Sequence, residues 1–158
     1  MMITKGVTAP ALSLYNTDKV LVNLADYRNK KNVLLLFFPL AFTSTCTSEL
    51  CSVRDNVKTY HNDTTEVFGI SVDSVYCLAA YQEKLNLNYP LLSDFNKVAS
   101  QEYGLLYESF SAMKLEGVSK RAAFLIDRKG VIQYCEILEN ANDVPDFNKI
   151  ESAIQLLR

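Results

Sequence analysis

The sequence contains no tryptophan, one histidine, five glycines, four prolines and four cysteines among its 158 residues. The few glycines and prolines are spread along the chain, so no flexible linker divides it into separate parts. With 49% hydrophobic and 22% charged residues, the composition suits a folded domain and excludes a disordered or fibrous segment. We therefore expect one domain that spans residues 1–158.

The chain also lacks an excess of one charge and a long apolar run. Its formal net charge is -2, and Lys and Arg are scattered among acidic residues, which excludes a basic stripe for nucleic acid. The longest apolar runs are too short to span a bilayer, and residues 1–10 lack the apolar core of a signal peptide. We expect a cytoplasmic protein that binds neither nucleic acid nor membranes.

The scarcity of histidine and cysteine limits the chemistry of any site. His61 lies 15 residues beyond Cys46, or roughly 22 Å along a helix, so a Cys–His catalytic pair is not expected. The cysteine separations of 5, 26 and 58 residues do not resemble paired zinc ligands. Four cysteines in a chain of this length do not make a dense disulfide framework, so we expect thiols in a reducing cytosol. A reactive cysteine without a metal or other cofactor is therefore the candidate site.

Hydrophobic patterning predicts alternating strands and helices. The apolar run 32–38 is typical of a strand buried on both faces of a parallel sheet. Further strands are predicted at 66–72, 91–92, 122–126 and 131–137, with helices at 44–60, 73–85, 96–103 and 146–158. Asp73 and Ser74 are predicted as the capping pair of the second of these helices. An additional hairpin is predicted at 11–14 and 20–24. This order predicts an α/β, thioredoxin-like fold with a mixed central sheet flanked by helices and an N-terminal β-hairpin extension.

Cys46 lies where the first buried strand is followed by a helix. The capping side chains of 44–49 place Cys46 in the first helical turn. There, backbone N–H groups and the positive end of the helix dipole favour an anion on sulfur. Because the thiolate is the nucleophile and an ordinary cysteine titrates near ~8.5, this position favours the reactive form.

Pro39 and Thr43, which precede Cys46, form a specific pattern with it. Pro39 ends the strand and could shield the sulfur, and Thr43 carries a hydroxyl that can accept a hydrogen bond from a bound substrate and donate one toward the thiolate. Alone, Pro39 is typical of a turn and Thr43 of a helix N-cap. Together, Pro39, Thr43 and Cys46 form Pro-x-x-x-Thr-x-x-Cys, which resembles the signature of the peroxiredoxin family, where these residues bind and attack the peroxide.

The resemblance extends through 70–73, 92–94 and 121–127, and so covers most of the chain. It implies that Arg121, before the strand 122–126, is the remaining member of the site. A guanidinium is always charged and carries several fixed donors, so it can stabilise a thiolate and orient a peroxide oxygen. The implied function is a thiol-specific peroxidase that reduces hydrogen peroxide and organic hydroperoxides through a Cys46 sulfenic acid, in antioxidant defence.

The second thiol is a separate question. Cys51 follows Cys46 by five residues, as in the bacterioferritin comigratory protein branch of the family, and this resemblance makes it the leading resolving cysteine. Five residues of intact helix rise about 7.5 Å and turn about 500°, so the first turn would have to unwind before a disulfide forms. Otherwise Cys51 is a small buried helix residue. The stretch 37–43 resembles instead the alkyl hydroperoxide reductase E branch, whose members can work with one cysteine and an external thiol.

The remaining expectations concern partners and rival functions. Cys77 and Cys135 are expected to be packing residues, and no cysteine-bearing segment follows the last helix, so the intersubunit resolving scheme of longer members is not expected. The resemblance implies a thiol reductant such as thioredoxin or a glutaredoxin-like protein, and a monomer or homodimer. Glu49 excludes a Cys-x-x-Cys reductase, and the lack of Trp disfavours a glutathione-peroxidase-like enzyme. A thioredoxin-fold binding or chaperone protein without turnover is the alternative.

Overall fold

The computed structural model describes residues 3–158; the first two residues of the stretch expected to lack a signal peptide lie outside the described range. A seven-stranded mixed sheet has the order β2-β1-β5-β4-β3-β6-β7. The strands are β1 (Ser13–Asn16), β2 (Leu21–Asn23), β3 (Asn32–Phe37), β4 (Thr65–Ser71), β5 (Leu91–Ser93), β6 (Arg121–Ile126) and β7 (Ile132–Leu138). The helices are the 3-10 helix η1 (Leu24–Tyr27), α1 (Ser44–Asp55), α2 (Val57–Tyr60), α3 (Val75–Leu85), α4 (Val98–Glu102) and α5 (Phe147–Leu156).

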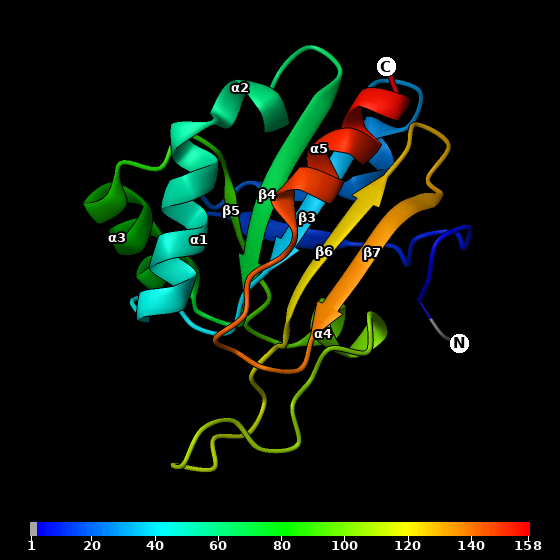
Figure 1. The fold of residues 1–158 in the computed structure, drawn as a ribbon. Helices are drawn as coiled ribbons and strands as arrows, with labels where there is room; N and C mark the ends of the chain where they lie inside the picture. Colours follow the sequence, from blue (N-terminus) through cyan, green and yellow to red (C-terminus); the bar gives the residue numbers. More distant parts are fainter. Residues whose placement is uncertain (1–2) are drawn as a thin grey trace.

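The central strand β3 divides the core into two layers. It pairs parallel to β4 and antiparallel to β6, and all six of its residues are buried. Leu34 and Leu36 pack in the layer that contains buried residues of α1, α3 and α5, while Leu35 and Phe37 pack in the layer that contains α4 and the N-terminal segment. Figure 1 shows the helices on both faces of the sheet. Coverage of both faces explains why this strand is apolar at nearly every position.

The fold class predicted from the sequence is confirmed, with differences in detail. The helix predicted from Ser44 to Tyr60 is broken at Asn56, whose φ of -124° and ψ of 31° are not helical, so α1 and α2 are separate. The N-terminal hairpin is present, but β1 also pairs antiparallel with β5. It therefore continues the central sheet instead of standing beside it. The helix α4 is also shorter than the predicted 96–103.

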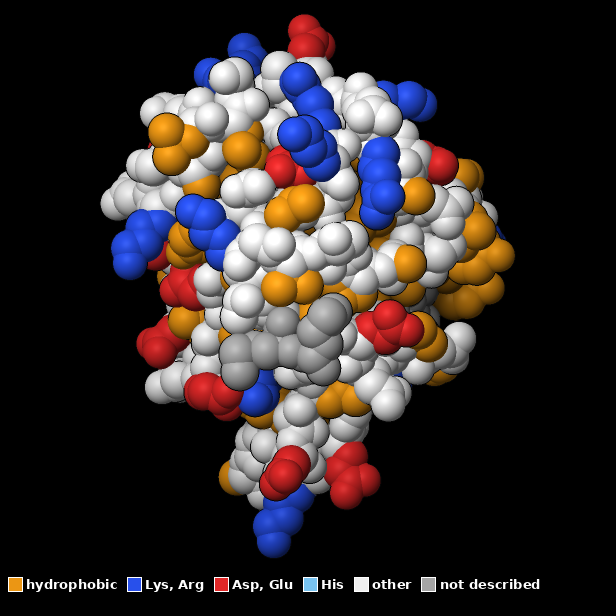
Figure 2. All heavy atoms as spheres, turned by 90° about the vertical axis from the view of Figure 1, so that its right-hand side faces the viewer, with side chains coloured by type: hydrophobic (Ala, Val, Ile, Leu, Met, Phe, Trp, Pro, Cys, Tyr) orange, Lys and Arg blue, Asp and Glu red, His pale blue; other side chains and the backbone are white. Residues whose placement is uncertain are grey.

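Between α4 and β6 the chain forms a projecting arm, residues 104–120, which sequence patterning does not predict. Isolated antiparallel bridges join Leu106 to Ser119 and Phe110 to Leu115 along the arm. Figure 1 shows it extending below the sheet, and the same projection lies at the bottom of Figure 2. On the face drawn in Figure 2, Lys and Arg occur together with Asp and Glu. The arm leads directly into the first residue of β6, which is Arg121.

None of the helices within residues 3–158 has the length and apolar character needed to cross a membrane.

The packing of β4 beside β5 depends on a glycine. At Gly69 in β4, an added Cβ would lie 2.6 Å from Leu91 Cδ2, 3.4 Å from Phe38 Cε1 and 3.6 Å from Leu50 Cδ2. All three neighbours are fully buried, so they have little space to move. The missing side chain thus leaves room for the Leu91 side chain of the neighbouring strand β5, while Leu50 of α1 lies at an ordinary contact distance.

We predict that Gly69→Ala lowers the free energy of unfolding by about 1–3 kcal/mol, because the added carbon overpacks a closely packed contact. Urea denaturation of the wild type and the variant measures this difference. The exposed substitution Ser152→Ala on α5 is the control and should stay within about 0.5 kcal/mol of the wild type. Equal stability of Gly69→Ala and Ser152→Ala would contradict the close approach.

Candidate active site

Cys46 is the third residue of α1 and is only 1% exposed. The helix begins after Thr43, whose extended backbone (φ -91°, ψ 153°) places it at the N-cap position. The predicted location of Cys46 in the first turn is therefore confirmed. Its sulfur lies at the end of the helix where backbone N–H groups lack intrahelical acceptors and the dipole is positive.

Arg121 brings a buried cation to the sulfur. It is the first residue of β6, and its side chain is 1% exposed. Its Nη2 donates to Cys46 Sγ at 3.4 Å and to the Ala141 carbonyl oxygen at 2.9 Å, while Nη1 donates to Glu49 Oε1 at 2.8 Å. The antiparallel pairing of β6 with β3 places this strand end beside the start of α1. The structure thus joins Arg121 and Cys46, as the family resemblance implied.

Glu49 is a member of this cluster that the sequence reasoning did not assign. It is fully buried against Arg121, and burial raises its pKa from 4.5 to about 7, an effect that the charge and hydrogen bond of Arg121 only partly offset. Glu49 Oε2 and Arg121 Nε have no hydrogen-bond partner within residues 3–158. The sequence spacing could have indicated this role, because Glu49 follows Cys46 by three residues and both therefore lie on the same helix face.

Thr43 and Pro39 lie on the segment that enters α1. Thr43 Oγ1 donates to the Leu40 carbonyl oxygen at 2.8 Å and makes no capping hydrogen bond to the helix. The expected donation toward the thiolate is therefore replaced by one to Leu40, and the lone pairs of the hydroxyl remain as acceptors. Pro39 is buried two residues after the end of β3.

All four cysteines are free thiols, and three of them lie outside this cluster. Cys51 is half-buried farther along α1. Burial and the neighbouring Asp73 raise the pKa of the Cys77 thiol, and burial and Glu136 raise that of Cys135. Cys46 is therefore the cysteine whose sulfur receives a hydrogen bond from a guanidinium, whereas burial and a nearby carboxylate raise the pKa of Cys77 and of Cys135.

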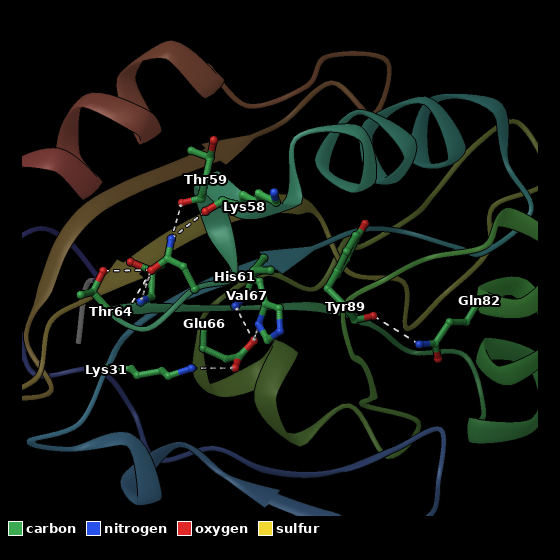
Figure 3. Close-up of polar contacts among 11 residues, drawn as sticks. Lys31, Lys58, Thr59, His61, Thr64, Glu66, Val67, Gln82 and Tyr89 are labelled. Atoms are coloured by element: carbon green, nitrogen blue, oxygen red, sulfur yellow. Dashed lines mark hydrogen bonds and ion pairs between the residues drawn. The ribbon is translucent and has the colours of Figure 1, made fainter.

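His61 belongs to a different cluster, shown in Figure 3. Its Nδ1 lies 2.6 Å from Glu66 Oε1, and Lys31 Nζ lies 3.7 Å from Glu66 Oε2. It follows α2 at the start of the connection to β4. The imidazole is therefore engaged by Glu66 and is not a partner of Cys46. Within the described part of the chain, no group of three or more His, Cys, Asp or Glu side chains could hold a metal ion.

Comparison with known proteins identifies the class. The family described as "AhpC/TSA family" matches residues 6–135. Alkyl hydroperoxide reductase E of Mycobacterium tuberculosis (strain H37Rv) is 38% identical over 138 residues, covering 86% of each chain. Thioredoxin-dependent peroxide reductase, mitochondrial, of Drosophila melanogaster is 34% identical over 144 residues, covering 87% of this chain and 57% of its own. The crystal structure of peroxidoxin BcpB from Mycobacterium tuberculosis superposes with a TM-score of 0.84 at 28% identity, covering 99% of both chains.

The fold and the buried thiol–guanidinium pair thus define a thiol-dependent peroxidase of the antioxidant type. The chain belongs to the AhpC/TSA family, the peroxiredoxins. Its similarity to alkyl hydroperoxide reductase E and to BcpB agrees with the two branches that the sequence resembles.

The raised pKa of Glu49 predicts a pH-dependent stability. The folded protein holds the Glu49 proton up to about pH 7, whereas the unfolded chain releases it near pH 4.5. The protonated carboxyl therefore contributes fully to the stability of the fold below about pH 4.5, and this contribution is lost as the pH rises through about 7. We therefore expect the free energy of unfolding of the wild type, relative to that of Glu49→Gln, to fall by about 1 kcal/mol or more as the pH rises from about 4.5 to about 7. Urea denaturation at several pH values measures it, and a pH-independent difference would contradict the raised pKa.

Proposed function

We propose that Cys46 is the peroxide-reducing cysteine and that Arg121, Thr43 and Pro39 complete its site. The observation that carries the proposal is the 3.4 Å contact between Arg121 Nη2 and Cys46 Sγ, both in side chains that are 1% exposed. A cation beside a shielded sulfur stabilises the thiolate, and its field is stronger in a buried site than in water.

In the proposed reaction the Cys46 thiolate attacks one oxygen of the hydroperoxide in line with the O–O bond. A sulfur–oxygen bond forms, the O–O bond breaks, and its electron pair leaves on the second oxygen, which takes up a proton and departs as water or an alcohol. Cys46 is oxidised to a sulfenic acid. Arg121 provides positive charge where the leaving oxygen becomes negative, and the Thr43 hydroxyl oxygen accepts a hydrogen bond from the peroxide. Pro39 shields the site from water.

We further propose that Cys51 resolves the sulfenic acid. Its thiolate would attack the Cys46 sulfur, so that an S–S bond forms and the S–O bond breaks; the hydroxide that leaves takes up a proton and becomes water. A thiol reductant would then restore both thiols. Two contacts hold the intervening helix: Thr47 Oγ1 lies 2.8 Å from the Tyr81 hydroxyl, and the Tyr89 hydroxyl donates to the Leu50 carbonyl at 2.7 Å. Because Thr47 lies between the two cysteines, local unwinding has to break its contact with Tyr81.

The remaining parts of the proposal concern substrates and partners. We propose hydrogen peroxide and organic hydroperoxides as substrates, thioredoxin or a glutaredoxin-like protein as reductant, and a monomer or homodimer in the cytoplasm. The named activity of the Drosophila melanogaster relative supports a thioredoxin-type reductant. The match to alkyl hydroperoxide reductase E favours turnover over a binding or chaperone role.

We predict that Cys46→Ser abolishes rapid peroxide reduction by the pre-reduced protein, because the hydroxyl that replaces the thiol is not ionised near neutral pH. Stopped-flow measurement of peroxide consumption tests this, with Cys135→Ser as the matched control. The control should react within about twofold of the wild type, since Cys135 lies outside the site and its substitution causes no loss of the nucleophile. A wild-type protein that consumes no peroxide would refute the proposed function.

For the resolving step, we predict that one equivalent of peroxide converts the wild type to a Cys46–Cys51 disulfide and converts Cys51→Ser to a persistent Cys46 sulfenic acid. Mass spectrometry of peptides, with a sulfenic acid trap present, separates the two products. Cys77→Ser, the substitution of another half-buried cysteine, should still form the disulfide. A persistent sulfenic acid in the wild type would rule out Cys51 as the resolving cysteine.

A further inference from the structure

The loop 38–43, which leads to Thr43, contains one residue with a strained backbone conformation. Phe42 has a φ of +68°, in the left-handed region that bulky residues rarely adopt. Its ring is half exposed and lies against Tyr81, with the ring centroids 4.8 Å apart. A conformation of this kind is strained and persists only when neighbouring groups hold it. The loop 38–43 therefore needs anchors outside itself.

Three backbone contacts hold the loop, and the middle one comes from a side chain distant in sequence. At its start, the Phe38 N–H donates to the Ile70 carbonyl at 2.9 Å; at its end, the Thr47 N–H donates to the Thr43 carbonyl at 3.0 Å. Between them, the Ala41 N–H donates to Asp73 Oδ2 at 2.8 Å. This middle contact joins the segment just before Phe42 to the residues that follow β4.

Asp73 is itself fixed by its surroundings. The Ser71 hydroxyl donates to the same Oδ2 at 2.6 Å, and the Asp73 N–H donates to Ser71 Oγ at 3.2 Å. The Ser93 hydroxyl donates to the Asp73 carbonyl at 2.6 Å, and Cys77 Sγ lies 3.8 Å from Oδ1. The carboxylate thus has a defined orientation set by β4, β5 and α3. Of the predicted capping pair Asp73 and Ser74, Ser74 is the N-cap of α3 and accepts from the Cys77 N–H, whereas the Asp73 carboxylate accepts from the Ala41 N–H of the loop.

We propose that Asp73 is a positioning residue for peroxide reduction: it fixes the Ala41 amide, keeps the strained turn at Phe42 in place and so sets the Thr43 hydroxyl relative to Cys46. This inference rests on the proposed function, because Thr43 matters only if a peroxide binds there. Asp73 acts through the loop and does not touch the sulfur. A charge-assisted hydrogen bond to a backbone amide is stronger than a neutral one, which suits an anchor that opposes backbone strain.

The expected size of the effect follows from geometry. In-line attack requires the peroxide to be held close to the sulfur in one orientation, and a displacement of about 1 Å can reduce a rate about 100-fold. Loss of the anchor should therefore slow peroxide reduction without removing any reacting group. It should leave the thiolate fraction of Cys46 unchanged, because Arg121 reaches the sulfur from β6 and makes no contact with Asp73.

The test compares Asp73→Ala, Asp73→Asn and Ser71→Ala in the full chain. The rate constant for hydrogen peroxide should fall about 10- to 100-fold in Asp73→Ala. It should recover to within about fivefold of the wild type in Asp73→Asn, whose amide oxygen still accepts from Ala41, although more weakly. Ser71→Ala removes a hydrogen bond that orients the carboxylate but leaves the loop contact itself, so its rate constant should lie between those of Asp73→Ala and the wild type.

Two further readings separate positioning from general damage. The thiolate fraction of Cys46, followed by its ultraviolet absorbance, should be the same in all four proteins. Hydrogen exchange at the Ala41 amide of the reduced wild type should be slow, and it should be fast in Asp73→Ala. Slow exchange at this amide in the wild type can be tested even if Asp73→Ala does not fold.

The inference is overturned if Asp73→Ala reacts within twofold of the wild type, if its thiolate fraction changes in step with its rate, or if the wild-type Ala41 amide exchanges freely. Exchange is measured without peroxide. A wild type that is inactive toward peroxide but has a protected Ala41 amide would therefore refute the proposed function, while the loop anchor would stand.

Discussion

The site depends on the solvation of one buried guanidinium. Moving a cation out of water is costly unless opposite charge and hydrogen-bond acceptors replace the lost water. Arg121 finds these in the Glu49 carboxylate, the Ala141 carbonyl and the Cys46 sulfur. These groups come from α1 and from the connection between β7 and α5, so the need to satisfy one cation brings together three parts of the chain that are distant in sequence.

The same interaction supports the proposal that Cys46 is the reactive cysteine. The Cys46 sulfur shares the Arg121 guanidinium with Glu49. Cys77 and Cys135 lie beside carboxylates, which together with burial raise the pKa of their thiols. Glu49 in turn limits the positive field at the sulfur whenever it is ionised, and its raised pKa places that change near neutral pH. If Cys46 reacts as proposed, its rate should depend on the protonation of Glu49, which does not contact the sulfur in the described structure.

Local patterns and a family resemblance predicted different parts of this arrangement. Apolar runs predicted the central strands, and capping residues placed Cys46 at a helix start, because both depend on neighbours in sequence. Arg121 was assigned through the family motif alone. Glu49 and Asp73 were predicted only as capping residues, because their partners are distant in sequence. Glu49 pairs with Arg121 of β6, and Asp73 accepts from the Ala41 amide of the loop. The break at Asn56 was also missed, because helical spacing continues across it.

The most direct test of this account is the rate of peroxide reduction when the Arg121 charge is removed without leaving an unpaired carboxylate in the site. The double variant Glu49→Gln/Arg121→Gln keeps two groups that can hydrogen-bond to each other, and circular dichroism would verify that it folds. The account predicts that its rate constant is about 100-fold or more below that of Glu49→Gln alone, the usual effect of losing a group that stabilises charge in a transition state. Equal rate constants in the folded single and double variants would contradict it.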